Sequence, residues 1–144
     1  MSAVRLTPLL RLAWWIHRWL LRLSGGRIAA SNNDMPVLLL TTRGRRSGEE
    51  RNVALQFLHD GDSYVVIGSF AGEDRHPSWW LNLEAAPDAN VMVRGRRQRI
   101  RAREALGEER DRLWQRVVEA DPAYAEYEQR TARRIPVVIL EPVD

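Results

Sequence analysis

Short apolar segments separated by turn residues fill the chain from residue 37 onward. The segment VLLLTT at 37–42 opens with consecutive apolar residues, a pattern consistent with a buried strand. Apolar and polar residues alternate in NVALQFLH at 52–59, so a strand there has two distinct faces. We expect one face in the core and the other open to a ligand. The first holds Val53, Leu55 and Phe57, and the second holds Asn52, Ala54 and Gln56.

Hairpins connect most of the predicted strands. DGDS at 60–63 is a turn signal, and YVVIGS at 64–69 is the expected returning strand. The remaining predicted elements are a helix at 78–86, strands at 90–94 and 98–106 around Gly95, a helix at 108–120, a second helix from about Asp121 and Pro122, and a strand at 136–140. This order favours an α+β fold in which a mainly antiparallel sheet of about six strands closes into a small barrel with peripheral helices.

The N-terminal segment LTPLLRLAWWIHRWLLRL at 6–23 combines leucine and tryptophan with arginines at positions 11, 18 and 22. Their spacing places the arginines in one stripe of an amphipathic helix. The charges argue against a transmembrane span, and the segment lacks the uninterrupted apolar stretch of a secretory signal. Three interpretations stay open: an interfacial membrane anchor, a helix packed on the domain's own core, and a partner-binding helix. We predict a boundary between this helix (1–30) and one barrel domain (31–144).

Composition narrows the chemistry. The chain has 144 residues, 44% of them hydrophobic, which suits a single core. It has no cysteine, which excludes disulfides, thiolate metal sites and a thiol nucleophile. Its histidines, His17, His59 and His76, have no metal-motif spacing, so we expect no metal site.

All 22 basic residues are arginine, and a pI near 10.1 favours anionic partners. On the predicted strand 98–106, Arg99, Arg101 and Arg103 alternate with smaller apolar residues and form a solvated face. No aromatic residues are interleaved with these arginines, which argues against nucleic-acid binding.

The sequence TTRGRRSGEERN at 41–52 places four arginines, two glycines and a serine between two predicted strands. Gly44 and Gly48 allow tight turns whose backbone N–H groups converge, and Ser47 adds a hydroxyl donor. The planar guanidinium binds phosphate or carboxylate through two parallel hydrogen bonds. The pattern matches no Walker-type loop, and a solvated charged turn is the alternative. Together these features favour a site for an acidic ligand.

Four segments, in order from about Val37 to Pro142, resemble the deazaflavin-dependent nitroreductase family: LLTTRGRRSGEERNVAL, VVIGSFAG, HPSWWLNL and RRIPVVILEP. The resemblance implies a split β-barrel oxidoreductase that uses reduced coenzyme F420 as its hydride carrier. The cofactor then supplies the organic chemistry, and the protein supplies binding, orientation and a proton path.

The resemblance also implies roles for particular residues. Arg45, Arg46 and Ser47 match the loop that holds the phosphate and acidic tail of the cofactor. Further cofactor contacts are implied for one strand, for the segment beside the deazaflavin ring and for the start of the short helix: Arg51, Asn52, Val53, Ala54, Leu55 and Gln56; Ile67, Gly68, Ser69 and Phe70; Ser78, Trp79, Trp80, Leu81 and Asn82.

The catalytic candidates are Ser69, Tyr124 and Tyr127. Ser69 is expected to hydrogen-bond the developing negative oxygen of the acceptor. Tyr124 or Tyr127 is expected to shape the pocket or donate the proton, and a contact between helix and core is the alternative for both.

Three positions depart from the family's pattern: Phe70 stands where some relatives have lysine, and Gln56 and Asp121 stand at tyrosine positions. They leave the acceptor open. We expect a quinone, with nitro compounds as adventitious acceptors. The alternatives are an FMN-dependent split-barrel reductase and a non-catalytic protein that binds F420 or lipid. We expect a cytoplasmic protein, peripheral at the inner face of the membrane if the N-terminal helix is an anchor, and the oligomeric state stays open.

Overall fold

The computed structural model describes residues 31–32 and 35–144. The predicted helix at 6–23 lies outside these residues. The elements are β1 (Ser31–Asn32), β2 (Met35–Arg43), β3 (Glu50–Gln56), β4 (Leu58–Asp60), β5 (Ser63–Ile67), the 3₁₀ turn η1 (Phe70–Gly72), α2 (Ser78–Ala85), β6 (Asp88–Val93), β7 (Arg96–Glu104), α3 (Gly107–Ala120), α4 (Ala123–Arg130) and β8 (Val137–Pro142).

The strands form one antiparallel sheet in the order β1-β2-β6-β7-β8-β5-β4, with β3 paired to the other edge of β2. The predicted strand at 52–59 is interrupted at Phe57. Its first part, β3, pairs with β2, and its second part, β4, pairs with β5. The Phe57 amide donates to the Pro36 carbonyl at 2.9 Å where the strand changes partner.

This change of partner curls the sheet into a split barrel. The path β2-β6-β7-β8-β5-β4 returns to β2 through the covalent continuation of β4 into β3. No ladder pairs β3 with β5 in the part of the chain that the structure describes, so the barrel is split there. The expected antiparallel split barrel is confirmed, with β1 and η1 as additions that the sequence did not predict.

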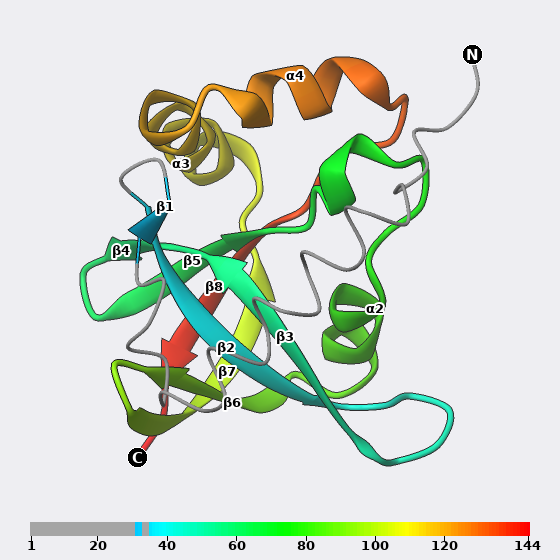
Figure 1. Ribbon diagram of the computed structural model, residues 1–144, viewed down its shortest axis with the longest axis vertical. Coiled ribbons are helices and arrows are strands. Elements are labelled where there is room, and N and C mark those ends of the chain that lie inside the picture. The colour runs from blue at the N-terminus through cyan, green and yellow to red at the C-terminus, as the bar shows by residue number, and fades with distance from the viewer. Residues whose placement is uncertain (1–30, 33–34) are drawn as a thin grey trace.

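Two large apolar clusters lie on opposite sides of the sheet, and Val37 and Ala54 form a third, smaller one. The interior cluster includes Leu38 and Leu40 of β2, and α2 adds Trp80 and Leu83 to it. The second cluster packs α3 and α4 on the outside of β5 and β8. Both faces are buried over residues 65–67 of β5 and 137–140 of β8, which fits the continuous apolar sequence of these two stretches. In Figure 1, α3 and α4 cover one end of the sheet, and α2 lies near the β2–β3 loop.

The predicted exposed arginine face is confirmed. Arg99, Arg101 and Arg103 of β7 are exposed, and Arg103 forms ion pairs with Glu109 at 2.7 Å and with Glu141 at 3.1 Å. No helix among the described residues is long and apolar enough to cross a membrane.

Candidate functional site

The loop between β2 and β3 is tightly folded and depends on two glycines. The Gly44 amide donates to the Glu49 carbonyl at 2.7 Å, and the Gly48 amide donates to the Gly44 carbonyl at 2.8 Å. Gly48 has a φ of +74°, a left-handed conformation that strongly favours glycine. A Cβ at position 44 would lie 2.9 Å from Ser47 Oγ and 3.2 Å from the Glu49 carbonyl oxygen. Any other residue at position 44 would therefore require Ser47 Oγ and the Glu49 carbonyl to move aside.

Asn82 of α2 anchors this loop to the barrel. Its Oδ1 accepts from the Arg45 amide at 3.2 Å and from Arg45 Nη1 at 3.0 Å. Its Nδ2 donates to Thr42 Oγ1 at 3.2 Å, and only 3% of Asn82 is exposed. Asn82 was expected to contact the cofactor directly. The structure gives its amide a second role, because it fixes the backbone and side chain of Arg45.

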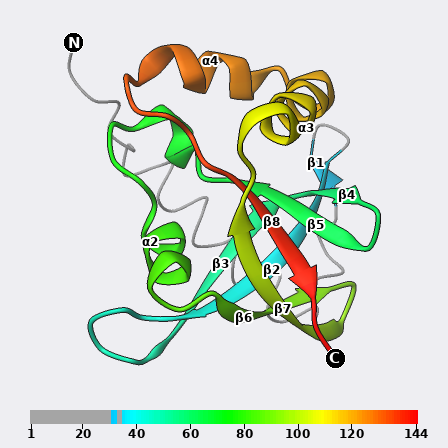
Figure 2. The ribbon, with the colours of Figure 1, turned by 180° about the vertical axis from the view of Figure 1, so that it is seen from behind.

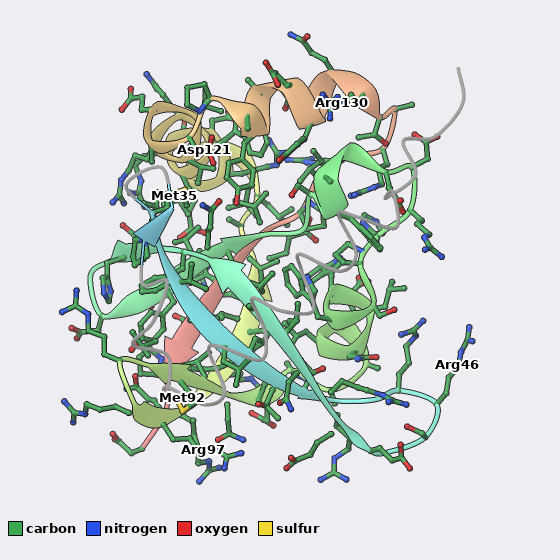
Figure 3. All side chains as sticks on the ribbon, in the orientation of Figure 1. Met35, Arg46, Met92, Arg97, Asp121 and Arg130 are labelled. Atoms are coloured by element: carbon green, nitrogen blue, oxygen red, sulfur yellow. The ribbon has the colours of Figure 1, made fainter. Side chains whose placement is uncertain are left out.

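The remaining charged groups of the loop face solvent. Arg46, Ser47 and Arg51 are exposed, and Figure 3 shows Arg46 projecting away from the barrel. Ser47 Oγ accepts from the Glu49 amide at 3.2 Å and from Arg51 Nη2 at 3.4 Å. Arg51 also lies 3.6 Å from Glu49 in an ion pair between two exposed side chains, an arrangement that contributes little free energy. The arginines can therefore turn to an anionic ligand at small cost.

The strand β3 presents only part of its predicted cofactor contacts outward. Val53 and Leu55 pack in the interior cluster. On the opposite face, Asn52 Oδ1 accepts from Thr41 Oγ1 at 2.7 Å. A hollow of about 220 Å³ adjoins this face of β2, β3 and β6, and Figure 3 shows Met92 and Arg97 of its lining. Apart from Asn52, its lining contains none of the predicted site residues; it comprises Leu39, Thr41, Glu50, Asn52, Asn90, Val91, Met92 and Arg97.

The tyrosines of α4 meet the end of β3. Tyr124 Oη donates to Gln56 Oε1 at 2.9 Å, and its ring is edge-on to Tyr127 at 5.6 Å between centroids. Only 7% of Tyr124 is exposed, whereas Tyr127 is half-buried. Burial, followed by the charge of Asp121, raises the pKa of both hydroxyls. Tyr124 therefore acts as a neutral donor to Gln56, and Tyr127 is the more accessible of the two.

Asp121 begins the turn that starts α4. Its Oδ1 accepts from the Ala123 amide at 3.1 Å, and its carbonyl accepts from the Tyr124 amide at 3.2 Å. Asp121 is buried, so this departure from the family's tyrosine pattern has a clear structural role. The sequence located the start of the helix correctly but did not show this contact.

The segment after β5 is strained. Phe70, Ala71 and Gly72 have φ values of 46°, 52° and 79°, three consecutive left-handed residues of which only one is glycine. Ser69, immediately before them, is 8% exposed. The Gly68 amide donates to the Pro136 carbonyl at 2.9 Å, which ties the segment to the start of β8.

The sequence interpretation did not single out Arg133, which reaches this segment from the loop after α4. Its Nη2 donates to the Ser69 carbonyl at 2.8 Å, and its Nε donates to the Glu73 carbonyl at 2.9 Å. A third contact joins Nη1 to Nδ1 of His76 at 3.1 Å. The segment RRIPVVILEP begins with this arginine, but the sequence assigned it no role because its partners lie about sixty residues earlier in the chain.

Some predicted site residues are core residues. Trp79, Trp80 and Leu55 are buried in the interior cluster, and Val53 packs against it partly buried. Ile67 is buried in the second cluster. Tyr124 of α4 also belongs to the second cluster, Tyr127 packs against it partly buried, and Ala54, expected on the ligand-facing side of its strand, is buried against Val37. The predicted side chains outside these clusters come from the β2–β3 loop, β3, the segment after β5, and α2: Arg45, Arg46, Ser47, Arg51, Asn52, Gln56, Ser69, Phe70, Ser78, Leu81, Asn82.

A family model and a relative both connect this chain to F420H(2)-dependent quinone reductases. Residues 14–142 match a family model described as F420H(2)-dependent quinone reductase. An F420H(2)-dependent quinone reductase of Mycobacterium tuberculosis (strain H37Rv) is 38% identical over 129 residues, which cover 87% of this chain and 87% of that protein.

Solved structures with the same fold include an F420-dependent reductase, in agreement with the family model. An F420-H2 dependent reductase (FDR-A) superposes with a TM-score of 0.68 at 41% identity, covering 74% of this chain and 94% of that one. A structure described as a domain-swapped dimer has a TM-score of 0.69 at 35% identity, covering 91% of this chain and 99% of that one. General Stress Protein 26 of Bacillus anthracis shares the fold alone, with 13% identity and a TM-score of 0.51, covering 75% of this chain and 80% of that one.

Proposed function

The chain belongs to the F420H(2)-dependent quinone reductase family, and from this premise we propose that it reduces a quinone with hydride from reduced coenzyme F420. The observation that carries the proposal is the β2–β3 loop, where exposed arginines surround a tight glycine turn in which a Cβ at position 44 would lie 2.9 Å from Ser47 Oγ. The family gives no support to an FMN-dependent reductase or to a non-catalytic carrier.

The residues of the loop fit the acidic part of the cofactor. F420 has a phosphodiester and a carboxylate-rich tail, and guanidinium groups bind both kinds of anion. We assign this contact to Arg45, Arg46 and Ser47, with Arg51 beside them. When bound, reduced F420 supplies the hydride, and the protein's own groups hold, orient and protonate.

Three groups are candidates for the acceptor side. Ser69 lies in the strained segment after β5, where its hydroxyl can stabilise negative charge on a quinone oxygen. Tyr127 is the better proton donor of the two tyrosines, because it is half-buried and Tyr124 already donates to Gln56. Tyr124 then shapes the site by fixing Gln56.

A quinone is the expected acceptor because the N-terminal segment at 6–23 has the composition of an interfacial membrane helix. Long-chain quinones dissolve in the bilayer, so attachment there would bring the enzyme to its substrate, and nitro compounds are adventitious acceptors. We expect full-length protein to bind vesicles that contain anionic lipid and a variant without residues 1–30 to remain in solution. Equal binding by the two proteins would contradict the membrane attachment but leave the reductase activity standing.

The test of the function compares two cofactors and two charge reversals. Purified protein should bind F420 in preference to FMN and should oxidise reduced F420 when menadione is added. Arg46→Glu should weaken F420 binding by at least about tenfold, since hydrogen bonds between charged partners contribute about 1.5–3 kcal/mol each. The matched control is Arg99→Glu, which reverses an exposed arginine on β7.

Salt provides an independent check. The loop is exposed, so the affinity for F420 should fall as ionic strength rises. The free energies of unfolding of both variants should lie within about 0.5 kcal/mol of the wild-type value because exposed arginines contribute little to stability. F420 binding that is unaffected by Arg46→Glu and by salt would reduce the loop to a solvated turn and remove the main support for the proposal.

A further inference from the structure

Arg133 connects three points of one loop. Figures 1 and 2 both show the segment after α4 running beside η1 before it enters β8. From this segment, the Arg133 guanidinium reaches the carbonyl groups of Ser69 and Glu73 and the ring of His76. The donor–acceptor distances are 2.8, 2.9 and 3.1 Å, all within the range of good hydrogen bonds. One side chain thus spans the loop that connects β5 to α2.

The contact requires arginine in particular. The N–H groups of a guanidinium point outward in a rigid plane, so a single side chain can serve acceptors on several sides. Arginine only donates, and Nδ1 of His76 is therefore the acceptor in their contact, which places the ring hydrogen on Nε2. A lysine ammonium at this position keeps the charge but cannot reach the same spread of acceptors.

The partners of Arg133 show that its role is not simple charge pairing. All three acceptors are neutral groups. Burial lowers the pKa of Arg133, and this effect outweighs the opposite effect of the nearby acids Asp74 and Glu73, which raise the pKa. Burying a cation whose N–H groups donate to backbone carbonyls and an imidazole carries an unfavourable desolvation free energy. The contribution of Arg133 therefore lies in the loop conformation that its hydrogen bonds stabilise.

That conformation would not persist unaided. Phe70 and Ala71 occupy left-handed backbone conformations that are unfavourable for residues with a Cβ. Gly72 lies against α4, where an added Cβ would lie 3.2 Å from Tyr127 Cα and 3.0 Å from Arg130 Cβ. The loop therefore contacts both α4 and the guanidinium of Arg133.

We propose that Arg133 is a positioning residue, which fixes the segment 69–76 so that Ser69 faces the reacting groups in a productive orientation. This inference rests on the proposed function, since the role of Ser69 in stabilising the acceptor belongs to it. This role requires no contact between Arg133 and the cofactor or the acceptor. Arg133 acts through the Ser69 carbonyl, and its loss lowers turnover without removing the loop that binds the cofactor's phosphate.

The test uses Arg133→Lys, Arg133→Met and the neighbouring Arg134→Met as a matched control, because Arg134 is exposed. His76→Leu removes one acceptor and keeps the arginine. Hydrogen–deuterium exchange reads the loop directly, since the Gly72 and Glu73 amides donate within it at 2.9 and 3.1 Å. Their exchange should accelerate by about tenfold or more in both Arg133 variants, by less in His76→Leu, and not at all in Arg134→Met.

Kinetics then separate positioning from binding. In both Arg133 variants we expect kcat with menadione to fall by about tenfold or more and the Kd for F420 to change by less than about threefold. Wild-type exchange and turnover in Arg133→Lys, or equal losses in Arg134→Met, would overturn the proposal. Should wild-type protein fail to oxidise reduced F420, the proposed function falls, and the exchange result alone decides whether Arg133 orders the loop. If Arg133→Met does not fold, Arg133→Lys and His76→Leu decide the same question.

Discussion

The hydroxyl of Tyr124 offers a sharp test of how α4 is attached to the barrel. Tyr124→Phe keeps the ring, and with it the edge-on contact with Tyr127, but removes the donor to Gln56 Oε1. At neutral pH the free energy of unfolding should fall by about 1 kcal/mol, the net contribution of a typical hydrogen bond. Because the hydroxyl is buried, alkaline pH should reverse the order of stability.

The reversal follows from proton linkage. Burial, then Asp121 and Tyr127, raises the pKa of Tyr124 in the folded protein, whereas the unfolded chain titrates near the ordinary tyrosine value of about 10. Below that value both states are protonated, and the hydrogen bond stabilises the fold in full. Above it the unfolded chain loses its proton while the folded protein keeps it, so stability declines as pH rises toward the folded pKa. At about pH 11 this decline amounts to about 1.4 kcal/mol, which is enough to cancel the advantage of the hydroxyl.

Urea unfolding followed by tryptophan fluorescence at several pH values from about 7 to 11 measures both effects. Taking the difference between wild type and Tyr124→Phe at each pH cancels the titration of all other groups. Tyr127→Phe is the control at neutral pH, since it leaves the hydrogen bond from Tyr124 to Gln56 in place. The pKa of the Tyr127 hydroxyl is also raised, so above about pH 10 this variant shows a pH dependence of the same sign. A difference that stays constant across the whole pH range would show that the hydroxyl is accessible to solvent in the folded state, and the attachment of α4 through Gln56 would be wrong.

Two further predictions concern the β2–β3 loop. Gly44→Ala should lower F420 affinity by about tenfold and the free energy of unfolding by about 1 kcal/mol, because the added Cβ would lie 2.9 Å from Ser47 Oγ and displace it. Calorimetric titration measures the affinity, and thermal unfolding measures the stability. Unchanged affinity would contradict the role of the turn. Asn82→Ala should lower the free energy of unfolding by about 2–3 kcal/mol and should also weaken F420 binding, since Arg45 loses its hydrogen bonds to the Asn82 side chain. Wild-type affinity for F420 in the folded variant would show that Arg45 does not depend on these hydrogen bonds to bind the cofactor.

The architecture and the anion loop could be predicted from the sequence because they depend on local patterns. Alternation at 52–59 placed Val53 and Leu55 in the core, and the structure confirms it. The turn around Gly95 and the helix at 108–120 follow from turn chemistry and helical periodicity over a few neighbouring residues. The charged loop was recognisable as a candidate site from its composition alone, although the roles of its individual residues stay predictions.

Tertiary structure decided which residues meet. The bend at Phe57 appears in no local pattern, because it arises only when one strand must pair with β2 and then with β5 to close a barrel. Two tryptophans look equally suited to a cofactor or to a core, and only the placement of α2 puts Trp79 and Trp80 inside. Arg133 finds its three acceptors about sixty residues earlier in the chain. Such contacts depend on the path of the whole backbone, so periodicity and spacing carry no signal for them.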